Sequence, residues 1–292
     1  MKGLLIVNEF LNTTKFSEHT NWLLSAAVKH NIEMTVMTNA ECLVILSSKR
    51  RQSFGAERPD FILFWDKDIL LARHLELLGF KVYNSAQAIE DCDNKARTHL
   101  ILTQQKIAMP KTILSPMTYQ NIGYTNHKFL REVEEELGFP MVVKECFGSF
   151  GAQVYLVENS EQLDDLVSKL AGIPMLFQEF IATSAGKDIR LQVVGGEVVA
   201  SMYRYSVNGD FRANITNGGK MKPYQPSEQE IQIALRCCEI LNLTFAGVDL
   251  LFGFQQAIVC EVNSNAHFKN IYDCTGVDTA DKIIEFIQAD CK

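Results

Sequence analysis

The sequence contains no apolar run close to the ~18 residues that a membrane-spanning helix requires. Its first apolar run, residues 3–7, is too short for a signal peptide and is followed by Asn8 and Glu9. An excess of basic residues is missing too, because 28 Lys and Arg stand against 35 Asp and Glu, giving a net charge of −7. Binding to a nucleic-acid backbone needs a basic face. We therefore expect a cytoplasmic protein that binds neither membranes nor nucleic acid.

Three common functional motifs are also missing. The eight cysteines include no C-x-x-C pair and no histidine at zinc-binding spacing, and several lie inside apolar segments, as reduced cysteines do. No G-x-G-x-x-G follows the first predicted strand, which argues against a dinucleotide site there, and no G-K-[ST] precedes a helix as in a Walker loop. What remains is typical of a globular enzyme: 292 residues, enough for two or three compact units, of which 47% are hydrophobic and 22% charged.

The first 92 residues are predicted to form an α/β unit. Strands separated by helices form parallel sheets with right-handed crossovers. The predicted strands are residues 4–7, 33–37, 61–65 and 81–83, and the predicted helices are residues 17–30, capped by Ser17, and 68–78. A helix-rich connection, residues 85–105, comes next and includes Lys95, which by itself is typical of a surface lysine.

A glycine-rich hairpin is predicted further along the chain. Apolar strands at residues 140–144 and 153–157 flank a loop that contains Gly148, Ser149 and Gly151. Two glycines in so short a loop allow the backbone to lie close over phosphate groups, as a lid would. An ordinary turn is the alternative.

Polar residues after two later strands suit an anionic ligand. Gln178 and Glu179 lie near the end of the apolar segment 175–180, where they can offer hydrogen bonds to an adenine edge or simply end a strand. Arg190, Arg204 and Arg212 fall within 23 residues and are interleaved with apolar strand residues. Arginines in such a pattern can bind an anionic reacting group, although surface salt bridges are equally compatible with it.

The segment 245–263 is predicted to be a hairpin that carries acids where apolar residues are expected. Glu261 and Asn263 are two positions apart on one strand and therefore share a face. A turn of three or five residues would set Asp249 opposite Glu261, whereas a turn of four would set it opposite Cys260. The first arrangement gives oxygen ligands that suit Mg²⁺ or Mn²⁺. A salt-bridged hairpin is the alternative, because buried charges need some partner.

The order of these motifs resembles the ATP-grasp superfamily, and within it the RimK-type α-L-glutamate ligases and the related LysX-type amino-acid ligases. The resemblance covers essentially the whole chain and is most specific from Gln178 to Asn263. It rests on these segments in this order: Asn94-Lys95, Val143-Lys144 with the glycine loop, Gln178-Glu179-Phe180, Asp188-Ile189-Arg190, Phe211-Arg212-Ala213-Asn214, Gly247-Val248-Asp249 and Glu261-Val262-Asn263.

This resemblance implies an ATP-grasp fold, α/β overall and α+β in its C-terminal part, in three units. They are an N-terminal Rossmann-like domain (residues 1–92), a linker helix with a central lid (93–174) and a C-terminal unit with a metal site (175–292). ATP would lie between the last two. The implied roles are Lys95, Lys144, Gly148, Ser149, Arg212 and Asn214 at the phosphates, Gln178, Glu179 and Phe180 at the adenine, Asp188 at the ribose, and Asp249, Glu261 and Asn263 at two Mg²⁺ or Mn²⁺ ions.

The implied reaction is amide-bond formation with release of ADP and phosphate. A substrate carboxylate would accept the γ-phosphoryl group of ATP, and an amine of a protein, peptide or metabolite would attack the acyl phosphate. Metals that bridge the phosphates would neutralise developing charge. Arg190, Arg204 and Arg212 are the expected catalytic residues. Arg190 and Arg204 could stabilise the acyl phosphate and the tetrahedral oxyanion, and Arg212 would reach the phosphates.

One departure concerns the substrates. RimK-type ligases continue after the last motif with Ser-Pro-Gly, whereas this chain continues Ser264-Asn265-Ala266-His267-Phe268-Lys269. The Phe-Lys ending is more similar to the LysX type, and it leaves open whether glutamate is the amino acid added. His267 and Lys269 are candidate substrate contacts. A non-catalytic ATP-binding sensor or scaffold, a peptide-tailoring ligase and a homo-oligomer also remain open at this point.

Overall fold

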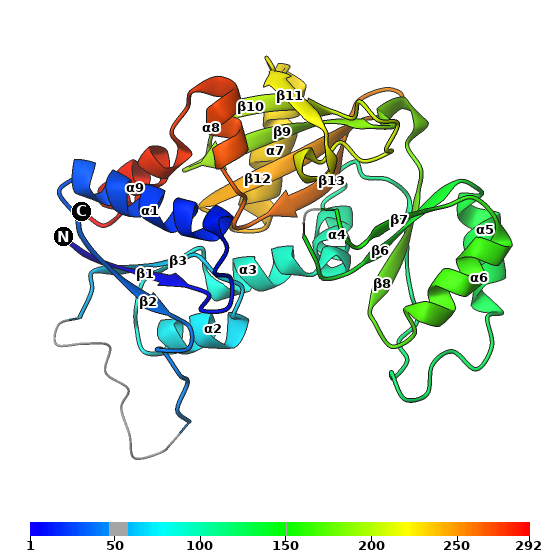
Figure 1. Cartoon of the computed structure of the whole chain (residues 1–292), viewed down its shortest axis with the longest axis horizontal. Coiled ribbons are helices and arrows are strands. Elements are labelled where there is room, and N and C mark those ends of the chain that lie inside the picture. The colour runs from blue at the N-terminus through cyan, green and yellow to red at the C-terminus, as the bar shows by residue number, and fades with distance from the viewer. Residues whose placement is uncertain (47–57, 150) are drawn as a thin grey trace.

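The computed structural model describes residues 1–46, 58–149 and 151–292 of the chain. Three β-sheets lie in a row along the long axis of the molecule, with helices packed on their faces (Figure 1). The N-terminal sheet is at one end, the sheet of the hairpin that carries Asp249 and Glu261 is in the middle, and the sheet of the glycine-rich hairpin is at the other end. This mixed α/β architecture confirms the predicted fold class.

The N-terminal sheet is parallel throughout, as predicted, with the order β2-β1-β3-β4. Its strands β1 and β3 are short, apolar and mostly buried, which suits a sheet covered on both faces. Helices α1 and α9 cover one face and α2 and α3 the other. These elements are β1 Lys2–Val7, α1 Thr14–Lys29, β2 Glu33–Thr38, β3 Phe61–Phe64, α2 Ile69–Leu77, β4 Val82–Tyr83, α3 Ala86–Asp93 and α9 Thr279–Asp290. The expected cap was wrong, since α1 begins at Thr14 and Ser17 lies inside its first turn.

The central unit is an antiparallel sheet with the order β5-β8-β6-β7 and two helices over its apolar face. Its elements are β5 Thr112–Leu114, α5 Phe129–Leu137, β6 Met141–Glu145, β7 Val154–Val157, α6 Ser160–Lys169 and β8 Met175–Glu179. Strand β8 pairs with β5 and β6 and not with any C-terminal strand. The predicted boundary at residue 174 therefore has to move past Glu179, because sheet pairing assigns β8 to the central unit.

The C-terminal sheet has the order β11-β10-β9-β12-β13 and is antiparallel. Helices α4 and α7 pack on one face, and α8 and α9 pack on the other. The elements are α4 Lys95–Gln104, β9 Lys187–Val194, β10 Glu197–Tyr205, β11 Lys220–Pro223, α7 Glu228–Ile240, β12 Phe245–Phe252, β13 Ala257–Asn263 and α8 Lys269–Thr275, with 3₁₀ turns η1 Ala182–Ser184 and η2 Ile215–Asn217. Because α9 packs on both α1 and β9, the first and last parts of the chain share one core.

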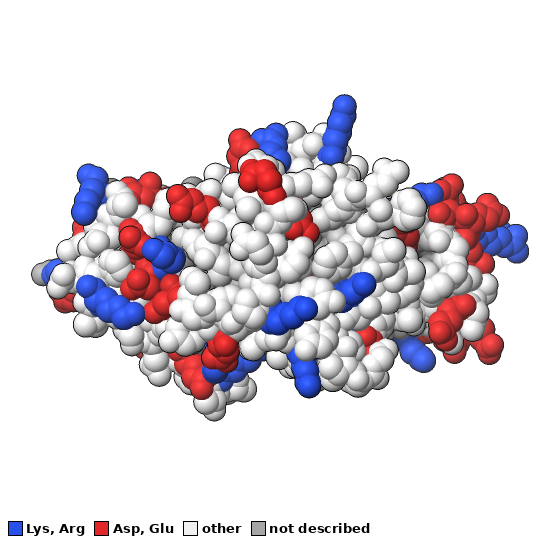
Figure 2. All heavy atoms as spheres, turned by 90° about the horizontal axis from the view of Figure 1, so that it is seen from above, with Lys and Arg blue, Asp and Glu red and all other residues white. Residues whose placement is uncertain are grey.

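The surface carries charges of both signs. On the face in Figure 2, basic and acidic side chains are interspersed among uncharged ones, and acidic side chains gather at the end formed by α5 and α6. Over the described ranges, no helix is both long enough and apolar enough to cross a membrane.

Candidate active site

A cavity of about 680 Å³ opens where the three sheets meet. Its walls come from the carboxyl ends of β1 and β3, the start of α4, the glycine-rich hairpin, the residues after β8, the strands β9 and β10, and the hairpin β12–β13. The lining includes all but one of the site residues predicted from the sequence. Those are Lys95, Lys144, Gly148, Ser149, Gln178, Glu179, Phe180, Asp188, Arg190, Arg204, Arg212, Asn214, Asp249, Glu261, Asn263 and His267.

Two lysines of the cavity wall are buried without a counter-charge. Lys95 is 9% exposed and Lys144 is 6% exposed. The Lys95 ammonium donates to the carbonyl oxygen of Gly148 at 3.0 Å, and Lys144 Nζ lies 3.7 Å from the Sγ of Cys260. Within the described ranges neither ammonium forms an ion pair with a carboxylate. Because a buried charge needs a partner, these two groups mark a place for an anion.

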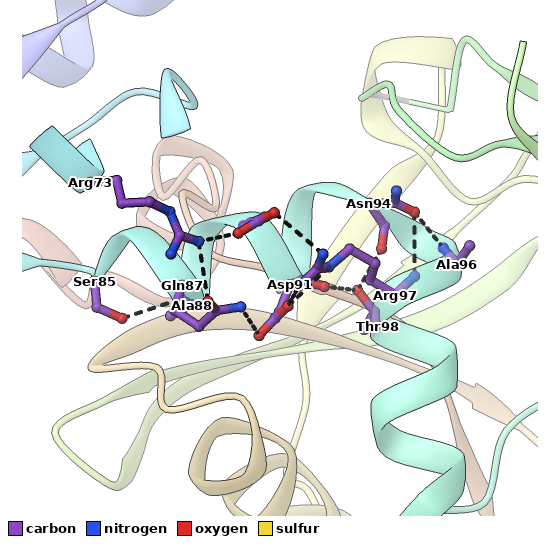
Figure 3. Close-up of polar contacts among 10 residues, drawn as sticks. Arg73, Ser85, Gln87, Ala88, Asp91, Asn94, Ala96, Arg97 and Thr98 are labelled. Carbon is purple, nitrogen blue, oxygen red and sulfur yellow. Dashed lines mark hydrogen bonds and ion pairs between the residues drawn. The ribbon is translucent and has the colours of Figure 1, made fainter. Parts of the chain in front are cut away.

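The position of Lys95 follows from the break between α3 and α4. Asn94 ends α3 and caps α4, its Oδ1 accepting from the backbone N–H of Ala96 at 3.0 Å (Figure 3). Arg97 binds Asp91 through Nη2 at 2.6 Å, and the Thr98 hydroxyl donates to the Asp91 carbonyl oxygen at 2.6 Å. These contacts hold the first turn of α4 against the last turn of α3. Lys95, which looked like a surface residue in the sequence, is thereby fixed in the cavity wall.

The glycine-rich hairpin contacts the loop after β10. Arg212 Nη1 donates to the Gly151 carbonyl oxygen at 2.8 Å, while the rest of its guanidinium binds Asp210. Gly151 has φ +73°, and a Cβ there would lie 2.7 Å from Asn214 Oδ1. Only glycine fits this close approach without strain. The structure therefore brings together two segments that the sequence predicted for the phosphates.

The residues at the end of β8 form another part of the wall. The amide nitrogen of Gln178 donates to Thr112 Oγ1 at 2.9 Å, and Glu179 Oε1 accepts from the backbone N–H of Lys111 at 2.7 Å. Burial, with Lys144 and Lys95 nearby, lowers the pKa of the adjacent His99 to about 3, so this imidazole is neutral. The Gln178 side chain is thus used within the protein, and the segment after it offers Phe180 to the cavity.

The β12–β13 hairpin combines a four-residue turn with a β-bulge. Phe252 pairs with Ala257, so a regular ladder would set Asp249 opposite Cys260. The register instead shifts between Asp249 and Leu250, and Asp249 lies opposite Glu261. The prediction that a four-residue turn would separate the two carboxylates was wrong, because the extra residue of the bulge restores their alignment.

Asp249 belongs to a buried chain of ion pairs. Arg190 binds it through Nε and Nη2, both at 2.5 Å, and Arg204 Nη2 lies 3.0 Å from its Oδ2. Arg204 also binds Asp188 at 2.7 and 2.8 Å. Burial alone would raise the pKa of Asp249, but the two arginines outweigh it and lower that pKa. The salt-bridged alternative therefore describes Asp249 as it stands in this structure.

The side chains around Glu261 carry oxygen atoms of the type that bind divalent cations. With its amide oriented to satisfy both ends, Asn263 donates to Glu261 Oε1 at 2.9 Å and accepts from Arg190 Nη2 at 3.3 Å. Glu261 forms no ion pair with any described residue. No group of three His, Cys, Asp or Glu side chains in the described ranges is placed to hold a metal. The carboxylate of Glu261 is thus an oxygen ligand that fits a metal, whereas the Asn263 oxygen and Asp249 both face the Arg190 guanidinium in this structure.

The two candidate substrate residues lie in different places. His267 lines the cavity, and its Nδ1 is 3.1 Å from Nε2 of the buried His19. Burial lowers the pKa of His267 to about 3 and that of His19 to about 4, so both rings are neutral at pH 7. Lys269 is the exception among the predicted residues, because it lies outside this cavity on α8 and pairs with Asp273 at 2.6 Å.

Residues of the N-terminal sheet complete the cavity and were not predicted from the sequence. Asn8 and Asp66 follow β1 and β3, and they meet Asn265, which follows β13. The available signal was their position, since polar residues just beyond the carboxyl ends of parallel strands gather at one sheet edge, where ligands bind.

Comparisons with known proteins identify the family of the chain. Residues 92–287 match the family described as the RimK-like ATP-grasp domain. The chain is 35% identical over 224 residues to beta-citrylglutamate synthase B of Danio rerio, covering 76% of this chain and 54% of that protein. It is 34% identical over 225 residues to a protein of Syntrophotalea carbinolica named "Probable alpha-L-glutamate ligase", covering 76% and 72%. The solved structure of the ATP-grasp ligase PsnB with a variant of its minimal precursor, Mg and ADP has a TM-score of 0.71 at 16% identity, covering 99% of this chain and 98% of that one.

Proposed function

Because the chain belongs to the RimK-like ATP-grasp family of ligases, we propose that its cavity joins an amino acid to a carboxylate at the expense of ATP. The products would be an amide, ADP and phosphate. The names of two similar proteins contain glutamate, which supports a glutamate-like amino acid as the group added. The acceptor is a metabolite, a peptide or a protein terminus. The chain spans only about half, 54%, of the length of beta-citrylglutamate synthase B.

The observation that carries this proposal is the pair of buried lysines that form no ion pair with a described carboxylate. Lys95 and Lys144 approach the cavity from different units, α4 and β6, so one anion between them would connect the two units. ATP phosphates supply such an anion and the charge that the site lacks. The neighbouring backbone of Gly148 and Ser149 and the Arg212–Asn214 segment lie where phosphate oxygens would need further donors.

The rest of the nucleotide would extend toward the end of β8. The ring of Phe180 lies 6.4 Å from that of Phe211, and both line the cavity. Aromatic walls with nearby polar groups are typical of adenine sites. We assign the adenine edge to the segment Gln178–Phe180. Asp188 is the candidate for the ribose, although its carboxylate is also the partner of Arg204.

Two Mg²⁺ or Mn²⁺ ions are assigned to Glu261, Asn263 and Asp249. Bound metal would neutralise the charge that develops on the phosphates during transfer. A metal at Asp249 would take over the role of the Arg190 guanidinium, which would free Arg190 to bind a substrate anion. Arg190 and Arg204 would then stabilise the acyl phosphate and the tetrahedral oxyanion, two species that carry negative charge in this buried place.

A substrate screen tests the proposal. The protein is incubated with ATP, Mg²⁺ and panels of amino acids, di- and tricarboxylates and acidic peptides, and ADP release is followed. Mass analysis of the positive wells identifies the amide. A nucleotide-binding sensor without ligase activity would bind ATP but release no ADP in step with any product.

A further inference from the structure

A buried carboxylate that forms no ion pair with any described residue lies on the N-terminal side of the cavity. Asp66, only 6% exposed, follows β3, and Asn8 follows β1 beside it. The amide nitrogen of Asn8 donates to both carboxylate oxygens of Asp66, at 3.1 and 3.2 Å. Both residues line the cavity. The carboxylate is therefore held in place by a neutral group.

The chain after β13 adds two more polar atoms, neither of which has a partner among the described residues. Asn265 donates its amide nitrogen to the Asp66 carbonyl oxygen at 2.8 Å, but its own Oδ1 is buried and accepts no hydrogen bond from any described residue. The Oγ of Ser264, a residue that is 2% exposed, has no partner in the described ranges either. Since buried polar atoms are nearly always paired in native proteins, these two atoms point to a ligand that donates hydrogen bonds.

The charge of Asp66 is not balanced in the way that the other buried carboxylates of the cavity are. Asp188 and Asp249 are bound by arginines, whereas Asp66 forms no ion pair with any described residue. Its neighbour Lys67 is paired with Asp93 at 2.5 Å. Burial raises the pKa of Asp66, and the negative charge of Asp68 raises it further. The Lys67 backbone N–H, the Asn8 amide and the Lys67 charge lower the pKa, but they do not cancel the rise. A cationic donor is the ligand that would satisfy this site.

Asp66, Ser264 and Asn265 lie beside the proposed phosphate and metal end of the cavity. Asn265 is two residues beyond Asn263, so their Cα atoms are at most ~7.6 Å apart. The same short segment therefore connects the proposed metal ligand with the residue that contacts Asp66. Asp66, Ser264, Asn265 and the proposed metal ligand Asn263 all line the same cavity.

We infer that Asp66, Asn265 and Ser264 bind the ammonium group of the attacking amino acid, and that the Asp66 carboxylate takes its proton before attack. An ammonium has three N–H donors, enough for these three acceptors. This inference rests on the proposed ligase function, and it adds the half of the site that receives the amine.

The step balances as follows. One proton passes from the ammonium nitrogen to a carboxylate oxygen of Asp66, which leaves a lone pair on nitrogen. The C–N bond forms as that lone pair attacks the acyl carbon, and the bond from carbon to the phosphate oxygen breaks. Phosphate leaves with the bonding electrons, and the second N–H proton departs with phosphate or through water. A carboxylate whose pKa is raised by burial is better matched to this transfer than an exposed one.

The test compares two amines on one carboxylate donor in the wild type and in Asp66→Asn. The twenty amino acids serve as ammonium probes, and hydroxylamine serves as an amine that is largely uncharged near pH 7 and needs no base. For the best amino acid, Asp66→Asn should lower amide formation roughly 100-fold or more. Hydroxamate formation should stay within about threefold, because activation of the carboxylate does not involve Asp66.

Asp60→Asn is the matched control. Asp60 is an exposed carboxylate of the same unit that accepts from the Lys2 backbone N–H at 2.7 Å, a role that asparagine keeps, and it does not line the cavity. This variant should leave both rates unchanged. The Tm of the free protein is a readout that needs no turnover. Asp66→Asn should not lower this Tm, since it removes a buried charge that forms no ion pair with a described residue.

Distinct results contradict the two claims. An equal loss of amide and hydroxamate in Asp66→Asn, no loss of either, or a wild type that makes hydroxamate but accepts no amino acid would overturn the role of Asp66. A wild type that forms neither ADP nor hydroxamate with any carboxylate would overturn the proposed ligase function, and this inference with it.

Discussion

The two carboxylates that face each other on the β12–β13 hairpin should respond differently to neutralisation. Asp249→Asn and Glu261→Gln both replace a carboxylate by an amide of nearly the same shape. Both should abolish turnover if the pair holds metal, because each removes charge that the metals need. Only Asp249→Asn, however, should destabilise the free protein, since Asp249 is bound by two arginines and Glu261 forms no ion pair with a described residue.

The magnitude follows from what Asp249 leaves behind. Asp249 accepts two bonds of 2.5 Å from Arg190 and lies 3.0 Å from Arg204. The amide of Asp249→Asn keeps one acceptor oxygen and no charge, and its NH2 group cannot accept from either guanidinium. Arg204 keeps Asp188, but Arg190 becomes a buried charge without a carboxylate partner. Breaking such a pair costs about 3–5 kcal/mol. In a chain of this size that corresponds to a fall in Tm of roughly 6–20 °C.

The pH dependence gives an independent check. Since the folded pKa of Asp249 is lowered, its stabilisation is present above the unfolded value, roughly pH 3.9, and is lost as the pH falls through the folded pKa. The Tm difference between the wild type and Asp249→Asn should therefore shrink on acidification. Thermal unfolding without metal measures all of these effects, with Glu261→Gln as the control. Equal stability of Asp249→Asn and wild type would refute the reasoning about the ion-pair chain.

Two further predictions concern the phosphate side. Lys144→Met should weaken ATP binding roughly 10–100-fold, the value of a charge-assisted contact, without lowering Tm, because Lys144 has no carboxylate partner to strand; calorimetric titration with ATP would contradict this if affinity were unchanged. Gly151→Ala should raise the KM for ATP, because the new Cβ would lie 2.7 Å from the Asn214 side chain. The control is Gly196→Ala, since Gly196 also has a positive φ but has open space around it. The control should strain the backbone about as much and leave the KM for ATP unchanged. Equal KM values in both glycine variants would remove the hairpin from the account.

The sequence predicted the elements of the fold better than their pairing. The β-strands of the N-terminal unit could be predicted because short apolar runs alternate with helices, and the parallel sheet followed from that order. Strand β8 could not be assigned to its sheet, since an apolar run does not say which edge it joins. A strand after Pro110 was predicted and is β5, whereas helices α5 and α8 and strand β11 were not predicted at all.

The same limit applies to the site. The β-bulge that aligns Asp249 with Glu261 depends on local pairing, and nothing in the composition of residues 257–263 indicates it. The burial of Lys95 depends on how α4 packs against the glycine-rich hairpin, where its ammonium donates to the Gly148 carbonyl oxygen. Asn8, Asp66 and Asn265 come from segments more than 50 residues apart in the chain, and only tertiary packing brings them together.

The central claim is that this cavity activates a carboxylate by phosphoryl transfer. The most direct measurement analyses the nucleotide products while hydroxylamine, added in place of the amine, traps the activated carboxylate. The proposed site places Lys95, Lys144, Arg212 and Glu261 around phosphate oxygens for transfer of the terminal phosphoryl group. We predict ADP and phosphate in step with hydroxamate for the correct carboxylate donor. Formation of AMP and pyrophosphate instead would contradict the account.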